Sequence, residues 1–336
     1  MDPIIIPLGA VALNLMFQFL RRFPTKATKI MRPGASVTKD EYENIVNAFL
    51  RDISFNTPSV RFKRDLQDQV EARLESQGIS PSLIQKIQLY IQTGTEIASW
   101  TYSFVSPELQ EDVQAFTSQL TQYPKPSHEL LRGFTCLLRE QGRLFGPFGG
   151  DMIVKGTQEF LSALKIELDQ SNEFYLPSDA SDSLAYFRVK TGVAEPFAFF
   201  CFPEDSHSEE KDLMNYISAM PSIMLFLGYV NDLLSFYKEE LKPGDSPNYI
   251  HSHAKLHNHA PHQSLKDLQK ETVELVKTLR RIFSVNSATI AQTERFIQGY
   301  VSYHLYSKRY RLSELNIPAV TDIHEWVHQM NSSQEY

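Results

Sequence analysis

The sequence predicts an all-α protein that forms a single domain. Hydrophobic residues recur with helical spacing along most of the chain, whereas the alternating pattern of β-strands is scarce. With 336 residues, 42% of them hydrophobic, the chain can bury a large core. No run of Pro, Gly or Ser is long enough to separate two domains. We therefore expect one helical domain over residues 1–336.

The expected helices follow one another along the chain, separated by short breaks. The first shows the pattern clearly, because Tyr42, Ile45, Val46 and Phe49 share one face after the capping sequence VTKDE. The second opens with Ser-Pro, which suits a first helical turn. The full series covers residues 40–53, 80–104, 107–122, 128–145, 153–170, 181–191, 211–241, 264–283 and 287–315. Pro-containing stretches at 123–126, 176–179, 202–210 and 242–248 are expected to end helices.

Charge and cysteine content restrict the classes of function. The net charge is -7 and no basic tract occurs, which argues against a nucleic-acid-binding protein. Cys136 and Cys201 are too few for a disulfide framework, so we expect a reducing, cytoplasmic setting. Residues 4–20 are apolar but interrupted by polar residues, Pro and Gly, and they follow Asp2. We expect residues 1–35 to pack on the helical bundle rather than insert stably into a membrane.

The stretch GYVNDLLSFYKEEL, residues 228–241, places three oxygen-bearing side chains in an apolar run. Asn231, Ser235 and Glu239 are four residues apart, so they lie in a line on one helix face. An amide, a hydroxyl and a carboxylate form a hard oxygen site that suits Mg²⁺, with waters and phosphate oxygens completing the shell. Lys238 is placed to reach the same anion. The alternative is a buried helix whose polar stripe meets solvent.

The last predicted helix has a comparable pattern. Tyr300 and Tyr303 fall at helical spacing, and Lys308, Arg309 and Tyr310 follow them. Aromatic faces stabilise cations, an arginine can bind phosphate oxygens with two N–H groups, and a tyrosine hydroxyl can donate to them. The alternative is an aromatic core stripe with a solvated basic end.

A further segment, YFRVKTGVAEPF at 186–197, places Arg188 one turn before a break expected at Gly192 and Pro196. A helix broken inside a cavity frees backbone carbonyls to face its contents, and an arginine there can hold an anion. An ordinary helix end is the alternative.

Together these segments resemble class I terpenoid synthases, and the fungal trichodiene synthase family in particular. NDLLSFYKE, residues 231–239, is similar to the second metal motif of that family. GYVSYHLYSKRYRLSEL, residues 299–315, is similar to its C-terminal helix with an Arg-Tyr pair. LFGPFGG at 144–150 and the segment around Arg188 fall in matching order.

The resemblance implies a helical bundle around a central apolar cavity, in which Mg²⁺ and basic residues hold a prenyl diphosphate, often farnesyl diphosphate. Loss of the diphosphate forms an allylic cation that is guided to a sesquiterpenoid product. By the resemblance, Asn231, Ser235 and Glu239 bind one Mg²⁺, and the diphosphate is held by Arg188, Lys238, Arg309 and Tyr310. The pocket wall would include Trp100, Phe104, Phe148, Tyr300 and Tyr303. The family also implies a homodimer.

The first, aspartate-rich metal motif of the family is missing. The corresponding helix, within residues 91–113, contains no Asp-Asp pair, and only Glu96 can act as a remnant ligand. The acidic stretch ELQED at 108–112 has the pattern of a solvated helix face. Three functions stay open. The chain is a synthase with a degenerate motif, or a homologue that couples a terpenyl cation to a nucleophilic co-substrate such as an amine or water. The third alternative is a non-catalytic protein that binds a terpenoid or a diphosphate.

Residues 242–263 carry five histidines within a polar, Pro-flanked segment. His253 and His257 have the spacing of zinc ligands on a helix, but the segment lacks Cys and a supporting carboxylate helix. We expect a polar loop near the mouth of the cavity rather than a zinc site.

Overall fold

The computed structural model describes residues 37–60, 66–105, 144–169, 181–240, 248–284 and 287–333, together with Leu138 and Gly142. Its regular elements are α-helices and short 3₁₀ turns, so the predicted all-α class is confirmed. The segment 1–35, the helix expected at 107–122, the acidic stretch 108–112 and most of 128–145 lie outside the described residues.

Of the helices in the first half of the chain, those over Lys39–Asp52 and Ser181–Thr191 match the prediction closely, whereas those over Leu66–Ser76 and Ala194–Phe199 were not predicted. The helix expected at 80–104 is divided at Ile87, and α7 begins six residues before the predicted position. The bounds are α2 (Lys39–Asp52), α3 (Leu66–Ser76), α4 (Pro81–Lys86), α5 (Gln88–Thr101), α7 (Pro147–Asp169), α8 (Ser181–Thr191) and α9 (Ala194–Phe199).

The second half includes three helices of at least 20 residues, α11, α13 and α14, and two helices that were not predicted, α12 and α15. The bounds are α10 (Glu209–Tyr216), η4 (Ile217–Ala219), α11 (Met220–Glu240), α12 (Tyr249–Leu256), α13 (Pro261–Phe283), α14 (Ser287–Tyr306), η5 (Lys308–Tyr310), η6 (Leu312–Glu314) and α15 (Pro318–Ser333). A single helix expected at 211–241 is therefore α10 and α11 joined by a 3₁₀ turn.

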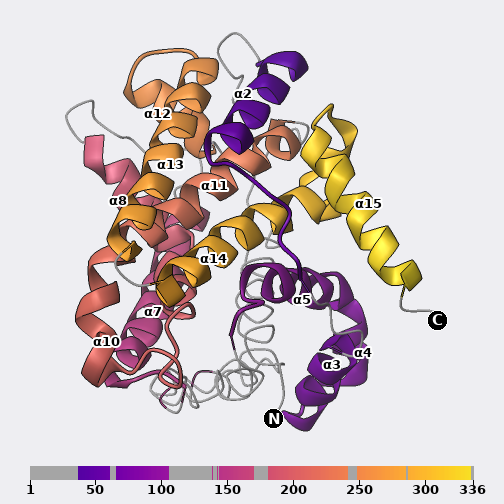
Figure 1. Cartoon of the computed structure of the whole chain (residues 1–336), viewed down its shortest axis with the longest axis vertical. Helices are drawn as coiled ribbons and strands as arrows, with labels where there is room; N and C mark the ends of the chain where they lie inside the picture. Colours follow the sequence, from indigo (N-terminus) through magenta and orange to yellow (C-terminus); the bar gives the residue numbers. More distant parts are fainter. Residues whose placement is uncertain are drawn as a thin grey trace.

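Helix α11 lies at the centre of the bundle. Figure 1 shows it between α13 and α14, with α8 and α10 at one side and α5 on the far side of α14. Its residues Phe226, Val230 and Leu233 are fully buried, so this apolar helix is accounted for as a core element. The continuous helical stretch Glu209–Glu240 is, by length and composition alone, also apolar enough to cross a membrane. Half of its most apolar window is buried inside the bundle, and the core helix of a protein without a membrane span can meet the same criterion.

Helices α5 and α14 approach each other closely at one glycine. A Cβ atom added to Gly299 would overlap the carbonyl oxygen of Trp100. Because that oxygen belongs to the backbone of α5, it cannot turn aside as a side chain can. Gly299 therefore sets the distance between the two helices, and with it the position of the aromatic face of α14.

The histidine-rich segment is not the loop predicted over 242–263. Residues 242–247 lie outside the described part, but α12 covers Tyr249–Leu256 and α13 already begins at Pro261. Two local features explain the helix. The Asn248 side chain accepts the backbone N–H of His251 at 3.0 Å, and the apolar positions of α12 are buried. Polar composition alone misled the prediction, because the apolar residues in it recur at helical spacing.

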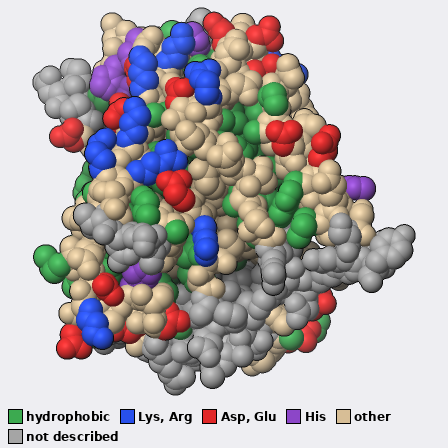
Figure 2. All heavy atoms as spheres, viewed as in Figure 1, with side chains coloured by type: hydrophobic (Ala, Val, Ile, Leu, Met, Phe, Trp, Pro, Cys, Tyr) green, Lys and Arg blue, Asp and Glu red, His purple; other side chains and the backbone are tan. Residues whose placement is uncertain are grey.

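On the face shown in Figure 2, Lys and Arg side chains over α12 and α13 lie among Asp and Glu side chains, and hydrophobic side chains are scattered between them. His251 binds Glu240 at 2.7 Å, and His253 lies 3.1 Å from the Ser264 hydroxyl. These contacts fasten α12 to its neighbours. Within the described residues, no group of three or more His, Cys, Asp or Glu side chains is arranged to hold a metal ion.

Candidate active site

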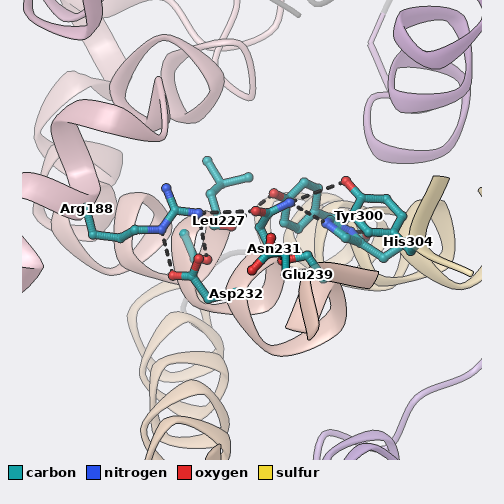
Figure 3. A network of polar contacts seen from close by, with 10 residues as sticks. Arg188, Leu227, Asn231, Asp232, Glu239, Tyr300 and His304 are labelled. Atoms are coloured by element: carbon teal, nitrogen blue, oxygen red, sulfur yellow. Dashed lines mark hydrogen bonds and ion pairs between the residues drawn. The ribbon is translucent and has the colours of Figure 1, made fainter. Parts of the chain in front are cut away.

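The polar ladder predicted from the sequence lies on α11. Ser235 is fully buried and its hydroxyl donates to Glu239 Oε1 at 2.6 Å, so the two predicted ligand oxygens converge. Asn231 is half-buried one turn earlier, and its amide carries the interactions drawn in Figure 3. The spacing of four residues thus places all three oxygens along one side of a core helix.

Arg188 reaches α11 from α8. Its Nε donates to Asp232 Oδ2 at 2.6 Å, and one terminal nitrogen donates to the Gly228 carbonyl at 3.2 Å and to Asn231 Oδ1 at 3.3 Å. A Cβ on Gly228 would lie 3.3 Å from the Arg188 side chain, so the glycine gives this arginine room to lie across α11. The side chains of Arg188 and Asp232 are only 14% and 11% exposed. A guanidinium group is therefore already held against the first oxygen of the ladder.

The break that was predicted after Arg188 occurs at Gly192 and Val193, not at Pro196. Val193 has a left-handed backbone with φ of 54°, which is strained for a β-branched residue. Pro196 lies inside the first turn of α9, where a missing N–H leaves no partner unsatisfied. The break therefore ends α8 one turn after Arg188, and α9 begins at Ala194.

His304 contacts Asn231 from the opposite side, on α14 (Figure 3). It is fully buried, its Nδ1 lies 2.8 Å from the Tyr300 carbonyl oxygen, and its Nε2 lies 3.2 Å from Asn231 Nδ2. Burial lowers the pKa of His304 to about 3, and the charges of Lys238 and Arg309 contribute to the same shift. The imidazole is therefore neutral at physiological pH.

The basic and phenolic residues predicted to hold an anion gather beside the ladder. Tyr310 accepts from Asn231 Nδ2 at 3.3 Å, and its hydroxyl donates to the Tyr303 hydroxyl at 3.3 Å. The Lys238 ammonium lies 4.8 Å from the centre of the Tyr310 ring, a cation–π distance. Burial raises the pKa of Tyr310, whereas the neighbouring charge of Arg309 lowers it. Tyr310 thus stays protonated and can donate to an anion.

These last residues are not on the α-helix that was predicted to run to residue 315. Helix α14 ends at Tyr306, and Lys308–Tyr310 form the 3₁₀ turn η5. Ser307 is extended and Arg311 has a left-handed backbone with φ of 61°, so the chain turns twice within five residues. The turn folds Tyr310 back against α11, a position that a continued helix would not reach.

Glu96 lies on α5 across from this turn. It accepts from Gln92 at 3.0 Å. Burial raises the pKa of Glu96, a hydrogen bond from Ser307 lowers it, and the charge of Lys308 lowers it as well. Glu96 and Glu239 are both close enough to raise the pKa of Tyr310. The structure therefore places Glu96 on the side of α5 that faces the residues predicted to hold an anion, and Ser307, just before η5, forms a hydrogen bond with it.

Aromatic rings extend from the polar network into the bundle. Tyr300 contacts Phe226 at 5.9 Å, Phe226 contacts Phe296 at 5.7 Å, and Phe296 contacts Tyr102 at 6.2 Å, measured between ring centroids. Phe104 packs on Tyr102 and lines a small apolar cavity, with room for about one water molecule, beside Ile223 and Phe296. Aromatic side chains of α11, of α14 and of the residues just after α5 thus form a continuous apolar interior below the ladder.

The predicted pocket residues fall in three places. Tyr300 and Tyr303 lie within or next to the polar network, and Phe104 lines the small cavity. Trp100 is fully buried against Tyr306 and Trp326, on the side of α14 that faces α15. Phe148 is 38% exposed at the start of α7 and packs on Phe199. The structure does not bring Trp100 and Phe148 to the network.

The chain matches the family model of trichodiene synthase (TRI5) over residues 93–324, which is more than half of its length. The chain belongs to the trichodiene synthase family. Within the matched range lie α11, α14 and the turn η5, and with them every residue of the polar network.

Relatives of this trichodiene synthase family member come from fungi. It is 29% identical over 307 residues to an (E)-beta farnesene synthase of Metarhizium brunneum, covering 85% of this chain and 92% of that one. It is 27% identical over 235 residues to the alpha-cuprenene synthase COP6 of Coprinopsis cinerea, covering 69% and 70% of the two chains. Among solved structures, a single-substitution variant of cucumene synthase aligns with a TM-score of 0.47 and 14% identity, over 74% of this chain and 99% of that one.

The residues present suit a magnesium ion of the kind expected for a family member. Ser235 and Glu239 converge, and Asn231 Oδ1 already accepts from a cation, the Arg188 guanidinium. The set is rich in oxygen but contains one carboxylate, so phosphate oxygens and waters would have to complete the shell. Such a set would hold the ion jointly with a phosphate-containing ligand.

Two residues of the network were missed at the sequence level. Asp232 stands inside the motif that was singled out, but only the fold shows that it pairs with Arg188. His304 had a usable signal, because it is the polar residue four positions after Tyr300 on an aromatic face.

Proposed function

We propose that this trichodiene synthase family member is a terpene synthase that acts on a prenyl diphosphate, with farnesyl diphosphate as substrate and Mg²⁺ as cofactor. One observation carries the proposal. The oxygen ladder of α11, the cationic side chains and the Tyr310 hydroxyl converge at one end of a packed aromatic interior. A molecule with an anionic head and an apolar, unsaturated tail has the chemistry that such a site would bind.

The diphosphate would be held by Arg188, Lys238, Arg309 and the hydroxyl of Tyr310. In the structure described here, Arg188 is paired with Asp232, and Lys238 rests on the Tyr310 ring. An incoming diphosphate offers both cations an anion with more charge than their present partners. The two groups would turn toward it, and binding would free the oxygen of Asn231 that Arg188 now covers.

Asn231, Ser235 and Glu239 would hold Mg²⁺ against the same diphosphate. When bound, the ion neutralises charge on the leaving group and so favours cleavage of the carbon–oxygen bond. The chain's own share is to place an amide oxygen, a hydroxyl and a carboxylate in line on a helix that is anchored in the core. Glu96, which accepts from Ser307 just before η5, would support the site from the facing helix.

The aromatic residues would stabilise the carbocation left after the diphosphate departs. Tyr300 and Tyr303 are buried, and burial raises the pKa of both hydroxyls. They therefore stay neutral and offer ring faces, not phenolate nucleophiles, to a cation. Phe226 and Phe296 extend this surface. Their packing also excludes water, which would otherwise capture the cation.

The test is turnover of farnesyl diphosphate with Mg²⁺, followed by pyrophosphate release and by gas chromatography of the organic products. We expect pyrophosphate and a sesquiterpenoid, and we expect Glu239→Gln to lower the rate by about 10²–10³. The matched control is Glu240→Gln, because the neighbouring carboxylate pairs with His251 instead of the ladder. The rate of that control is expected to stay near that of the parent protein.

The assay also separates the other functions. Release of pyrophosphate only when an amine is added would favour coupling of the terpenyl cation to an external nucleophile. Binding of pyrophosphate with Mg²⁺ in calorimetry, without turnover of farnesyl or geranyl diphosphate, would leave a binding protein and refute the synthase. A chain that binds neither pyrophosphate nor farnesyl diphosphate would refute the whole proposal.

A further inference from the structure

The amide of Asn231 can serve as a metal ligand in only one of its two orientations. Its oxygen and nitrogen are nearly the same size, so a half-turn of the amide exchanges an acceptor for a donor at the same position. A donor that faces the metal side would repel the ion. A ligand role for Asn231 therefore requires contacts that hold its amide in one orientation.

The hydrogen bonds around Asn231 fix that choice from both ends. At one end, Arg188 can only donate, so the atom 3.3 Å from its guanidinium must be the oxygen Oδ1. At the other end, the Tyr300 carbonyl can only accept, so the proton of His304 must be on Nδ1, at 2.8 Å from it. His304 Nε2 then carries a lone pair, and it faces Asn231 Nδ2 at 3.2 Å.

We propose that His304 is a positioning residue that sets the orientation of the Asn231 amide for metal binding. The inference rests on the proposed function, because it assumes that Asn231 is a ligand. Tyr310 is the other partner of Nδ2, at 3.3 Å, but a hydroxyl can accept or donate and so tolerates both orientations. When a diphosphate draws Arg188 away, His304 is the one partner in this network that still discriminates between the two.

The test compares metal binding with and without the acceptor of His304. His304→Phe keeps an aromatic ring but removes the acceptor, and His304→Gln keeps an acceptor in nearly the same place. The probe is Mn²⁺ in the presence of pyrophosphate, followed by electron paramagnetic resonance. Loss of a side chain that orients a ligand typically weakens metal binding about 10–100-fold, which we expect for the phenylalanine variant. The glutamine variant should recover most of that loss.

Two further variants distinguish positioning from packing. Val301→Ala removes apolar volume from the same buried helix without touching the amide, so it should lower stability but not Mn²⁺ affinity. In an Asn231→Asp background both atoms at the end of the side chain are oxygens, and orientation no longer matters. There the phenylalanine substitution at position 304 should leave Mn²⁺ affinity unchanged within about twofold.

The outcomes bear differently on the two proposals. If the parent protein binds no Mn²⁺ in the presence of pyrophosphate, the proposed function is refuted and this inference with it. If the parent protein binds Mn²⁺ but His304→Phe binds it equally well, only the positioning role is refuted. The same conclusion follows if Val301→Ala weakens binding as much, or if His304→Gln recovers nothing.

Discussion

Replacement of Asp232 by Asn should destabilise the protein, and pyrophosphate should reverse much of the loss. Arg188 and Asp232 are 2.6 Å apart with side chains 14% and 11% exposed, so they form a largely buried ion pair. Removal of one partner from such a pair costs about 3–5 kcal/mol, because the other charge stays buried without compensation. Arg188 keeps the Gly228 carbonyl and Asn231 Oδ1 as acceptors. We therefore expect the low end, about 3 kcal/mol, in the free energy of unfolding.

The measurement is urea denaturation followed by circular dichroism, with and without pyrophosphate. In the parent protein pyrophosphate must compete with Asp232 for Arg188, whereas in Asp232→Asn it meets a guanidinium that lacks its carboxylate. Pyrophosphate should thus stabilise the variant more than the parent protein. The control is Asp52→Asn, which removes an exposed ion pair with Arg51 and should cost less than about 1 kcal/mol.

A loss below about 1 kcal/mol for Asp232→Asn would contradict the account of a buried pair. Equal stabilisation of the parent protein and the variant by pyrophosphate would contradict the placement of Arg188 in the anion site. The two results are independent, so the assay tests the ion pair and the binding role separately.

Three other changes test how the scaffold holds the site. Gly299→Ala places a methyl group against a backbone carbonyl of α5, so it should lower the free energy of unfolding by about 3 kcal/mol or prevent folding. The control is Gly150→Ala, because a Cβ added there makes only an ordinary contact. In urea melts this control should be neutral or stabilising. Glu209→Ala removes the carboxylate that accepts two backbone N–H groups at the start of α7, so it should lower the free energy of unfolding by about 1 kcal/mol. The control is Glu210→Ala, which removes an exposed neighbouring side chain and should change stability little. For His304, the pKa of about 3 in the folded protein lies below the value of about 6.5 in the unfolded chain. Its contribution to stability is therefore complete above pH 6.5 and is lost as the pH falls, by about 2 kcal/mol between pH 7 and pH 5. His304→Phe should remove this part of the measured pH dependence of unfolding.

The helices and the ladder were predictable because both depend on residues close in sequence. Hydrophobic spacing identified α2, α8 and α13 almost to their ends, and steps of four residues placed Asn231, Ser235 and Glu239 on one face. The failures also have local causes. The end of α14 depends on a left-handed Arg311, and α12 on a capping Asn248, and neither feature changes the hydrophobic pattern.

The orientation of the ladder was not predictable, since it depends on contacts between distant segments. Asn231 meets Arg188 from 43 positions earlier in the chain and His304 from 73 positions later. Spacing along one helix gives the direction in which a side chain leaves the backbone, but not which of its atoms faces a neighbour. For an amide that distinction decides between a ligand and a repulsive donor.

The same network explains how a metal site can be built around so few acidic groups. In the structure described here, the Arg188 guanidinium covers Asn231 Oδ1 and neutralises Asp232, so the oxygens of α11 are satisfied without a metal. Under the proposed function, binding of a diphosphate would then need an exchange of one cation for another, not a rearrangement of the buried helix. Since this exchange would free a ligand oxygen only when the anion is present, metal and diphosphate affinities would rise together. A chain with one carboxylate in this ladder would depend on that coupling more than a chain with a full aspartate-rich cluster.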